Sequence, residues 1–163
     1  MSKAKNTTRR GARELAFQVL YGLSFTPAES RADLRRAFVL SPHNTAMDEQ
    51  DLGSEPTGFA WELVEGVWGN SAALDTAISR FSHNWRVDRM GRIELTLLRL
   101  AVFEMLYRQD VPPKVAINEA LELSGQFGED NAKNFVNGIL DAAAKALESG
   151  ELVPSAGQAP ANS

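Results

Sequence analysis

The segment from Leu95 to Tyr107 limits the fold of this chain more than any other. Its residues, LTLLRLAVFEMLY, are apolar around nearly the whole circumference of a helix, and such a helix is usually the buried centre of a domain. Asp88 can cap this helix, and the pair Pro112-Pro113 stops it and starts the next one. The sequence therefore predicts a bundle built around one buried helix.

The same segment does not predict a membrane span. It is shorter than the roughly 20 residues that a bilayer crossing needs, and it contains Arg99 and Glu104. The basic start of the chain is not followed by the apolar segment of a secretory signal. We expect no membrane association and a cytoplasmic location.

Helical spacing of apolar residues recurs on both sides of the central segment. Asn6, Thr7 or Thr8 could cap the first of these helices. The helices predicted from this spacing cover residues 12–23, 32–40, 59–81, 88–107, 113–127 and 132–147. The helix over 59–81 would need about six turns. No segment alternates apolar and polar residues between hairpin turns, so the sequence predicts an all-α protein without strands.

Three other segments lack helical spacing. Residues 1–10 carry basic side chains and are expected to form a flexible arm before a helical domain over 11–148. Residues 41–56 gain acids, Pro and Gly, which is typical of a long surface loop. After Glu148 the composition turns to Gly, Pro, Ser and Ala, which predicts a disordered tail over 149–163.

The composition excludes several kinds of catalytic and metal site. The chain has no cysteine, which excludes disulfides, zinc–thiolate sites and cysteine nucleophiles. Only His43 and His83 are present, and neither belongs to a metal-binding spacing. No GxSxG elbow exists to expose a serine nucleophile. We therefore predict no metal, no cofactor and no enzymatic activity.

Charge is distributed unevenly along the chain. The net charge is -4, which speaks against a generic nucleic-acid binder, because phosphate contacts normally leave a basic composition. Acids crowd residues 48–55, where a solvated loop is the simplest interpretation. Before the first acid, Glu14, stand five cations: Lys3, Lys5, Arg9, Arg10 and Arg13. This pattern indicates a basic arm on an acidic body.

The segment FGEDNAKNFVNG, residues 127–138, has two interpretations. Gly128 and Asp130 or Asn131 suit the stop and start of a tight turn between two helices. A phosphate-binding loop is excluded, because no strand and no Gly-Lys-Ser/Thr ending are present. A polar stripe follows, made of Asn134, Asn137, Gly138 and Asp141. It is either a solvated face or, beside Lys133, part of an anion site.

Three segments of the chain resemble the NusB family of bacterial transcription antitermination factors. They read RRGARELAFQVLYGL, LLRLAVFEML and DVPPKVAINEALELSGQFGEDNAKNFVNGILD. The resemblance covers residues 9–23 and about 88–144, whereas 24–82 matches mainly in the order of its helices. It implies about six to seven helices in two packed subdomains, about 11–83 and 84–148. It also implies binding of boxA-type RNA from ribosomal RNA operons.

The resemblance further implies partners and site residues. The expected partners are a NusE-type small-subunit ribosomal protein and the RNA polymerase antitermination complex, and both a monomer and a homodimer remain open. The residues that it implies for RNA binding are Lys5, Arg9, Arg10, Arg13, Tyr21, Asn131, Lys133 and Phe135. Arginines suit phosphates, and an aromatic ring suits an unpaired base. Glu94 matches a family position implicated in the partner contact.

Several alternatives remain open at the level of the sequence. Phe17 shares the stripe of Arg10, Arg13 and Tyr21, but we expect it in the core. Phe135 could equally serve core packing, and Glu94 could be an ordinary exposed glutamate. For the whole chain, the alternatives are a helical protein-interaction module without RNA affinity and an accessory domain of an RNA methyltransferase. No glycine-rich strand-turn-helix for a methyl-donor cofactor is present in the sequence.

Overall fold

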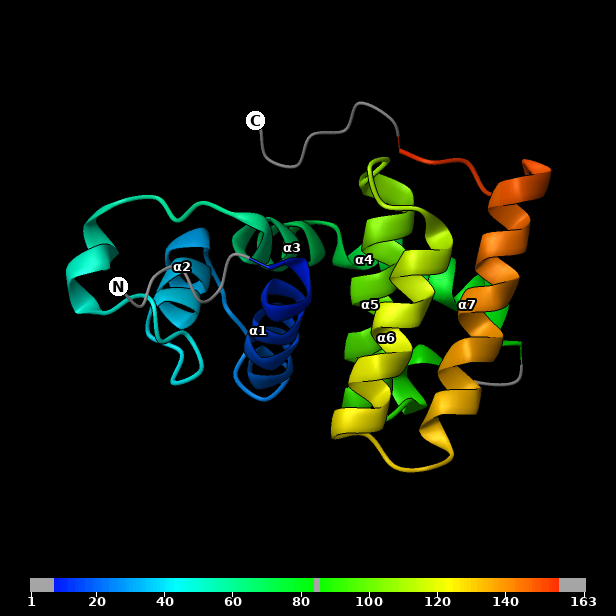
Figure 1. The fold of residues 1–163 in the computed structure, drawn as a ribbon, viewed down its shortest axis with the longest axis horizontal. Helices are drawn as coiled ribbons and strands as arrows, with labels where there is room; N and C mark the ends of the chain where they lie inside the picture. The colour runs from blue at the N-terminus through cyan, green and yellow to red at the C-terminus, as the bar shows by residue number, and fades with distance from the viewer. Residues whose placement is uncertain (1–7, 84–85, 156–163) are drawn as a thin grey trace. The chain divides into compact units, whose positions relative to one another are not determined.

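All regular elements in the described part of the protein are helices. The structure is a computed structural model that describes residues 8–83 and 86–155. The elements, labelled in Figure 1, are α1 (Arg9–Leu23), α2 (Arg31–Val39), η2 (Glu49–Gly53), α3 (Phe59–Gly69), α4 (Ser71–Ser82), η3 (Val87–Arg89), α5 (Arg92–Tyr107), α6 (Pro113–Phe127) and α7 (Ala132–Ser149). The predicted all-α class is confirmed. None of these helices is long and apolar enough to cross a membrane.

The chain divides into two compact units, Met1–Glu65 and Gly66–Ser163, at a point inside α3. The sequence placed the change of subdomain later, near residue 84. The end of α3 belongs with the second unit because Gly66 faces α5 closely. A methyl group at Gly66 would overlap the ring of Phe103, so the missing side chain permits this approach.

In the first unit, α1 begins one residue after a cap that the sequence proposed. The Thr8 hydroxyl oxygen accepts a hydrogen bond from the Gly11 amide at 3.0 Å, which satisfies one of the free amides of the first turn. Arg9 and Arg10 therefore belong to the helix, although the sequence placed them in a flexible arm. Lys5 lies outside the described residues.

Arg31 and Arg35 of α2 both pair with Glu55 in the acidic segment between α2 and α3, and Arg31 also reaches α3. The Arg31 guanidinium donates to Glu55 at 2.6 Å and also to Glu65 of α3. These hydrogen bonds from Arg31 hold the pKa of the Glu55 carboxyl below its ordinary value. The loop also contains η2, which Asp48 caps. At Glu55 the segment is thus anchored, whereas the sequence suggested a merely solvated loop.

The sequence prediction of one long helix over 59–81 is wrong. Two helices occupy this span, and they are separated at Asn70, whose backbone leaves the helical region with φ -120° and ψ 20°. The Asn70 side-chain amide donates to the carbonyl oxygen of Gly66 at 2.8 Å. Glycine and asparagine are weak helix formers, and asparagine competes for backbone groups. The pair Gly69-Asn70 therefore ends α3, although the apolar spacing continues across it.

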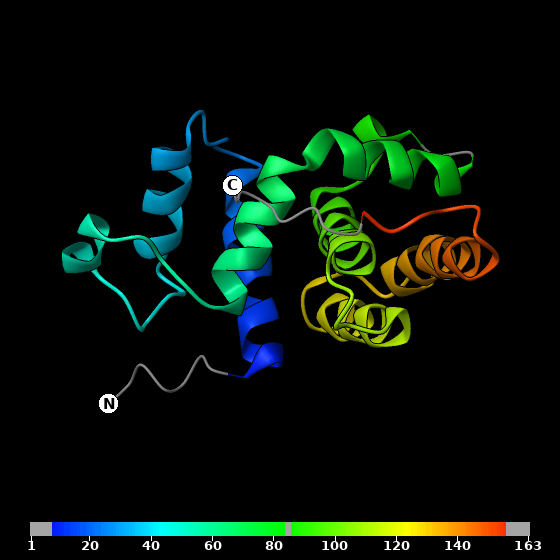
Figure 2. The same cartoon turned by 90° about the horizontal axis from the view of Figure 1, so that it is seen from above.

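In the second unit, α5 is the buried centre that its composition predicts. It packs against α4, α6 and α7, as Figure 2 shows from above, and its residues from Thr96 to Leu106 are all buried except Arg99. The predicted cap at Asp88 is wrong. The helix begins at Arg92 because Met90 and Gly91 have extended backbones, and Asp88 instead accepts hydrogen bonds from Arg86.

The last helices follow the turn signals of the sequence closely. Pro112 occupies the cap before α6, and that helix stops at Gly128. After α7, Gly150 adopts the left-handed conformation with φ 87°, which favours glycine. The composition predicted disorder from 149 onward. The described part of this tail is instead held in place, because Leu152 is buried and the Ser155 amide donates to the Leu106 carbonyl at 2.8 Å.

Candidate functional site

The residues that the resemblance implies for function fall into both units. Arg9, Arg10, Arg13 and Tyr21 belong to α1 of the first unit. Glu94, Asn131, Lys133 and Phe135 belong to the second. The residues of the first unit are mainly arginines, whereas three of those in the second unit line a pocket.

At the start of α1, two arginines one turn apart share an aromatic partner. The guanidinium carbons of Arg9 and Arg13 lie 4.3 and 5.2 Å from the centroid of the Phe59 ring, close enough for cation–π attraction. Arg9 and Arg10 are exposed, whereas Arg13 is only 4% exposed. Arg13 therefore packs α1 against Phe59, whereas Arg9 and Arg10 are accessible to solvent.

The other end of α1 carries a short run of aromatic rings. Tyr21 is half-buried, stacks on Phe17 with centroids 5.9 Å apart, and meets the edge of Phe25 at 5.1 Å. Phe17 is 2% exposed, as the sequence prediction of a core residue required. Phe25 is 56% exposed. Neither Phe25 nor Phe59 was predicted as a site residue from the sequence, although the spacing of four from Tyr21 to Phe25 could have indicated Phe25.

Three implied site residues line one pocket of the second unit. Glu94 at the start of α5 and Asn131 and Phe135 at the start of α7 enclose a space of about 250 Å³. The rest of its wall consists of Arg89, Met90, Gly91 and Ala132. We call this space the α5–α7 pocket. It brings together Glu94, implied for a protein partner, with two residues implied for RNA. Lys133, the residue after Ala132 in α7, is exposed and does not line the pocket.

Polar side chains of the α5–α7 pocket have unused hydrogen-bonding capacity. Across residues 8–83 and 86–155, no hydrogen bond or ion pair engages the Glu94 carboxylate, the Arg89 guanidinium or the Asn131 side-chain amide. Asn131 stands at the cap position of α7 but does not cap it with its side chain. Phe135 is half-buried, so core packing does not account for all of its ring. The wall of the pocket thus combines a carboxylate, a guanidinium, a side-chain amide and an aromatic ring.

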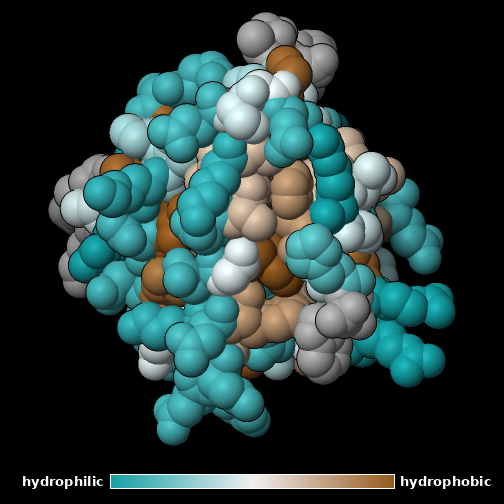
Figure 3. Space-filling view, turned by 90° about the vertical axis from the view of Figure 1, so that its right-hand side faces the viewer, coloured by the Kyte–Doolittle hydropathy of each residue, from teal (hydrophilic) through white to brown (hydrophobic). Residues whose placement is uncertain are grey.

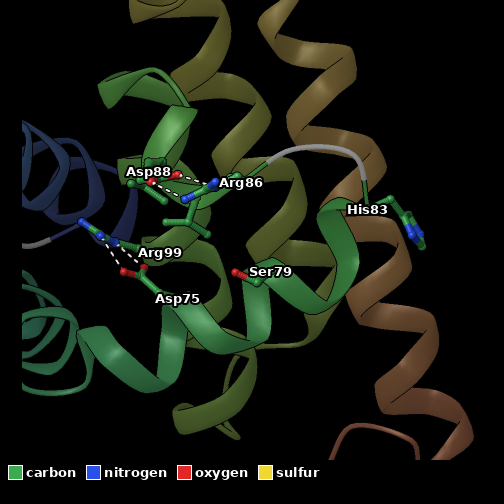
Figure 4. A pocket seen from close by; sticks show the side chains of 8 residues that line it. Asp75, Ser79, His83, Arg86, Asp88 and Arg99 are labelled. Atoms are coloured by element: carbon green, nitrogen blue, oxygen red, sulfur yellow. Dashed lines mark hydrogen bonds and ion pairs between the residues drawn. The ribbon is translucent and has the colours of Figure 1, made fainter.

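A second pocket in the same unit contains none of the implied residues. It measures about 590 Å³ and lies among α4, η3 and α5 (Figure 4). Its charges are already paired, since Arg99 holds Asp75 at 2.7 and 2.8 Å and Arg86 holds Asp88. His83 points away from these pairs in Figure 4. Within the described ranges, no cluster of three His, Asp or Glu side chains could hold a metal ion.

The polar stripe of α7 is solvated along its length. Asn134, Asn137, Gly138 and Asp141 are all exposed, and Asp141 pairs with Lys145 at 3.1 Å. In the view of Figure 3, hydrophilic side chains cover most of the surface and border a band of apolar ones. The geometry therefore supports the solvated interpretation for the stripe beyond Lys133.

The family model and the relatives reported below all point to the same family. The model of the NusB family matches residues 10–145. The transcription antitermination protein NusB of Desulfovibrio desulfuricans is 74% identical over 153 residues, with 93% of each chain covered. Its counterpart in Oleidesulfovibrio alaskensis is 62% identical, with 93% of this chain and 96% of the relative covered.

Solved structures with the same fold give the same result. NusB of T. maritima aligns with a TM-score of 0.70 at 30% identity and covers 90% of this chain and 99% of its own. A second structure holds the antitermination factors NusB and NusE in complex with dsRNA. It aligns with a TM-score of 0.65 at 26% identity, over 85% of this chain and 96% of that one.

Proposed function

The chain belongs to the NusB family, and we propose that it acts as a transcription antitermination factor that binds RNA together with a NusE-type small-subunit ribosomal protein. The similar structure of NusB and NusE with dsRNA is the observation that carries this proposal. Its relatives are named as antitermination proteins and not as enzymes, in agreement with the sequence prediction. The finer proposal is that the RNA is of boxA type, from ribosomal RNA operons, and that the protein joins an RNA polymerase complex.

Exposed cations of both units support the RNA-binding part of this proposal. Arg9 and Arg10 stand at the exposed start of α1, and Lys133 is exposed at the start of α7. Cations of this kind bind phosphates and release counterions, which gives RNA affinity a steep salt dependence. Tyr21 and the exposed ring of Phe25 offer aromatic surface for unpaired bases. Arg13 contributes by fixing α1, since its own guanidinium is buried.

The acidic body supports the protein partner. The net charge of -4 complements a basic ribosomal protein, and complementary charge speeds association and disfavours wrong partners. The resemblance implies Glu94 for this contact, and its carboxylate is half-buried. Family membership and the similar structure of NusB with NusE support the proposed partner, which does not depend on this one residue.

A titration with boxA-type RNA, with and without the ribosomal protein, tests the proposal. We expect the protein to prefer boxA-type RNA over a scrambled RNA of equal composition, and the partner to strengthen that preference. Affinity should fall as salt rises. Binding of the partner with no RNA affinity under any condition would instead support the interaction module. Equal affinity for both RNAs would remove the boxA assignment and leave general RNA binding.

A further inference from the structure

One aromatic ring of the first unit contacts two arginines of α1. Phe59 is the first residue of α3, and its ring centroid lies 4.3 Å from the guanidinium carbon of Arg9 and 5.2 Å from that of Arg13. Both distances are within the roughly 6 Å at which a cation is attracted to the face of a ring. The Phe59 side chain is half-buried. Phe59 thus joins the start of α3 to the basic first turns of α1.

The two ring contacts have different consequences. Arg13 is 4% exposed, so its contact with Phe59 serves the packing of α1. Arg9 is exposed, and its guanidinium stays accessible to a ligand while Phe59 holds it. The N–H donors of a guanidinium lie in its own plane, so contact with the face of a ring does not use them. Arg9 can therefore keep its ring contact and donate to a phosphate at the same time.

Holding Arg9 in the free protein favours its binding to an anion. A long side chain that is immobilised on binding loses conformational entropy. A contact that already restricts the side chain reduces this loss, which is the general effect of preorganisation. The backbone of Arg9 is fixed as well, because Arg9 follows the Thr8 cap of α1, whose hydroxyl accepts from the Gly11 amide at 3.0 Å. The cap and the ring together restrict both the backbone and the side chain of Arg9.

A glycine turn before α3 brings Phe59 to this place. Gly58 has a φ of 101°, in the left-handed region that favours glycine. A methyl group at Gly58 would meet nothing within 4 Å, so the backbone conformation, and not a lack of space, accounts for the glycine. The Gly58 carbonyl accepts a hydrogen bond from the Glu62 amide at 3.0 Å. The turn therefore sets the start of α3, from which the Phe59 ring meets α1.

We propose that Phe59 is a positioning residue for RNA binding, which holds the Arg9 guanidinium where it meets a phosphate of the RNA. The proposal rests on the proposed RNA-binding function and adds to it a residue that the resemblance did not imply. Phe59 acts through Arg9 and does not touch the RNA itself. Two observations carry the proposal: the ring contact of an exposed arginine, and the fixed backbone on both sides of that contact.

A double-mutant cycle with the full chain and a boxA-type RNA tests the proposal. Phe59→Leu keeps apolar bulk and removes the aromatic face. It should weaken RNA binding about 2- to 5-fold, the value of an exposed cation–π contact expressed as a ratio of affinities. In the Arg9→Gln background, Phe59→Leu should cause no further loss, because both changes remove the same interaction. A role of Phe59 in packing alone would cause the same loss in both backgrounds.

Rescue and control variants use other aromatic rings. Phe59→Tyr keeps the aromatic face and should bind RNA as the wild type does. Phe81→Leu is the matched control, because the Phe81 ring of α4 also contacts an arginine, Arg80, at 5.4 Å. The resemblance implies no RNA contact for either residue of that pair, so Phe81→Leu should leave RNA affinity unchanged. Thermal unfolding checks the fold of each variant, and Phe59→Met takes the place of Phe59→Leu if the leucine variant is unfolded.

The outcomes distinguish this proposal from the function on which it rests. Wild-type affinity for Phe59→Leu, or equal losses in the two Arg9 backgrounds, would overturn the positioning role and leave the proposed function standing. Failure of the wild-type protein to bind RNA at all would overturn both. If Phe59→Tyr weakened binding as much as Phe59→Leu, the aromatic face would not be the cause and the positioning role would be wrong.

Discussion

Arg10 and Arg13 lie three positions apart on α1 and have opposite environments. Arg13 is buried against the Phe59 ring, whereas Arg10 is exposed. Arg13→Ala should lower the free energy of unfolding by about 2 kcal/mol, the size of a desolvated cation–π contact. Arg10→Ala should change it by less than about 0.5 kcal/mol, as surface substitutions usually do. Urea unfolding of both variants measures the difference, and equal losses would contradict the assigned roles.

The sequence predicted that Arg10 and Arg13 belong to one surface, but it could not predict that one is buried and the other exposed. A helical wheel places both beside the apolar stripe, and the resemblance implies RNA contact for both. Only the fold brings Phe59, far away in the sequence, over Arg9 and Arg13. The same limit applies to Glu94. The sequence predicted that Glu94 lies on the central helix. Its proximity to Asn131 and Phe135 could not be predicted, because it depends on how α5 packs against α7.

At the scale of elements, the segment after α7 provides a sharp test of packing. Leu152 is 8% exposed, and its amide donates to the Ala146 carbonyl at 3.0 Å, whereas its neighbour Val153 is 70% exposed. Leu152→Ala should cost about 2 to 3 kcal/mol of stability, the lower part of the range for buried leucines. Val153→Ala should cost almost nothing. If both were neutral in chemical unfolding, the segment would be as loosely held as its composition suggested.

The link between α2, the acidic loop and α3 should depend on pH. The hydrogen bonds from Arg31 lower the pKa of Glu55. The contribution of this pair to folding stability is therefore fully present when the pH is above 4.5, the ordinary pKa of glutamate. It is lost as the pH falls through the lowered value of the folded state. Arg31→Met should therefore destabilise the protein near neutral pH, by about 1 kcal/mol or less for so exposed a pair. The difference from wild type should shrink in acid.

Urea unfolding of wild type and Arg31→Met across this pH range measures the effect. Arg36→Met provides the control, since Arg36 is an exposed arginine of the same helix. Its difference from wild type should not depend on pH in the same way. A difference for Arg31→Met that stayed constant down to strongly acid pH would show that the pair with Glu55 does not contribute to stability.

Helix boundaries show which local signals the sequence carries well. The proline pair predicted the start of α6 because proline fixes its backbone and lacks an amide hydrogen, and Gly128 predicted the end of α6 because glycine favours helix ends. The break at Asn70 was missed because the apolar stripe continues through it. Asp88 was misassigned because an acid before a helix resembles a cap, whereas here it pairs with Arg86. Periodicity predicts which face is buried better than it predicts where a helix stops.

At the scale of the whole molecule, composition and patterning predicted the class and missed the division of the chain. Uninterrupted apolar character identified α5 as the core, and the lack of alternation excluded strands. The boundary inside α3 could not be predicted, because it depends on the close approach of Gly66 to Phe103. Overall charge was also a poor guide to partners. The net charge of -4 conceals the exposed cations that RNA binding would use.

Salt dependence can show whether both units contribute to RNA affinity. For single-stranded RNA, each phosphate contact adds about 0.7 to the slope of log affinity against log salt. Arg10→Gln and Lys133→Gln, one in each unit, should each reduce the slope by about that amount, and the double variant by about 1.4. Lys145→Gln is the control on α7, because Lys145 already pairs with Asp141.

Titrations at several salt concentrations give these slopes directly. The reductions should add because each cation that neutralises a phosphate releases its own counterions. A slope that Lys133→Gln leaves unchanged, with Arg10→Gln effective, would confine the phosphate contacts to α1. Additive losses would instead require that residues of both units act on the RNA.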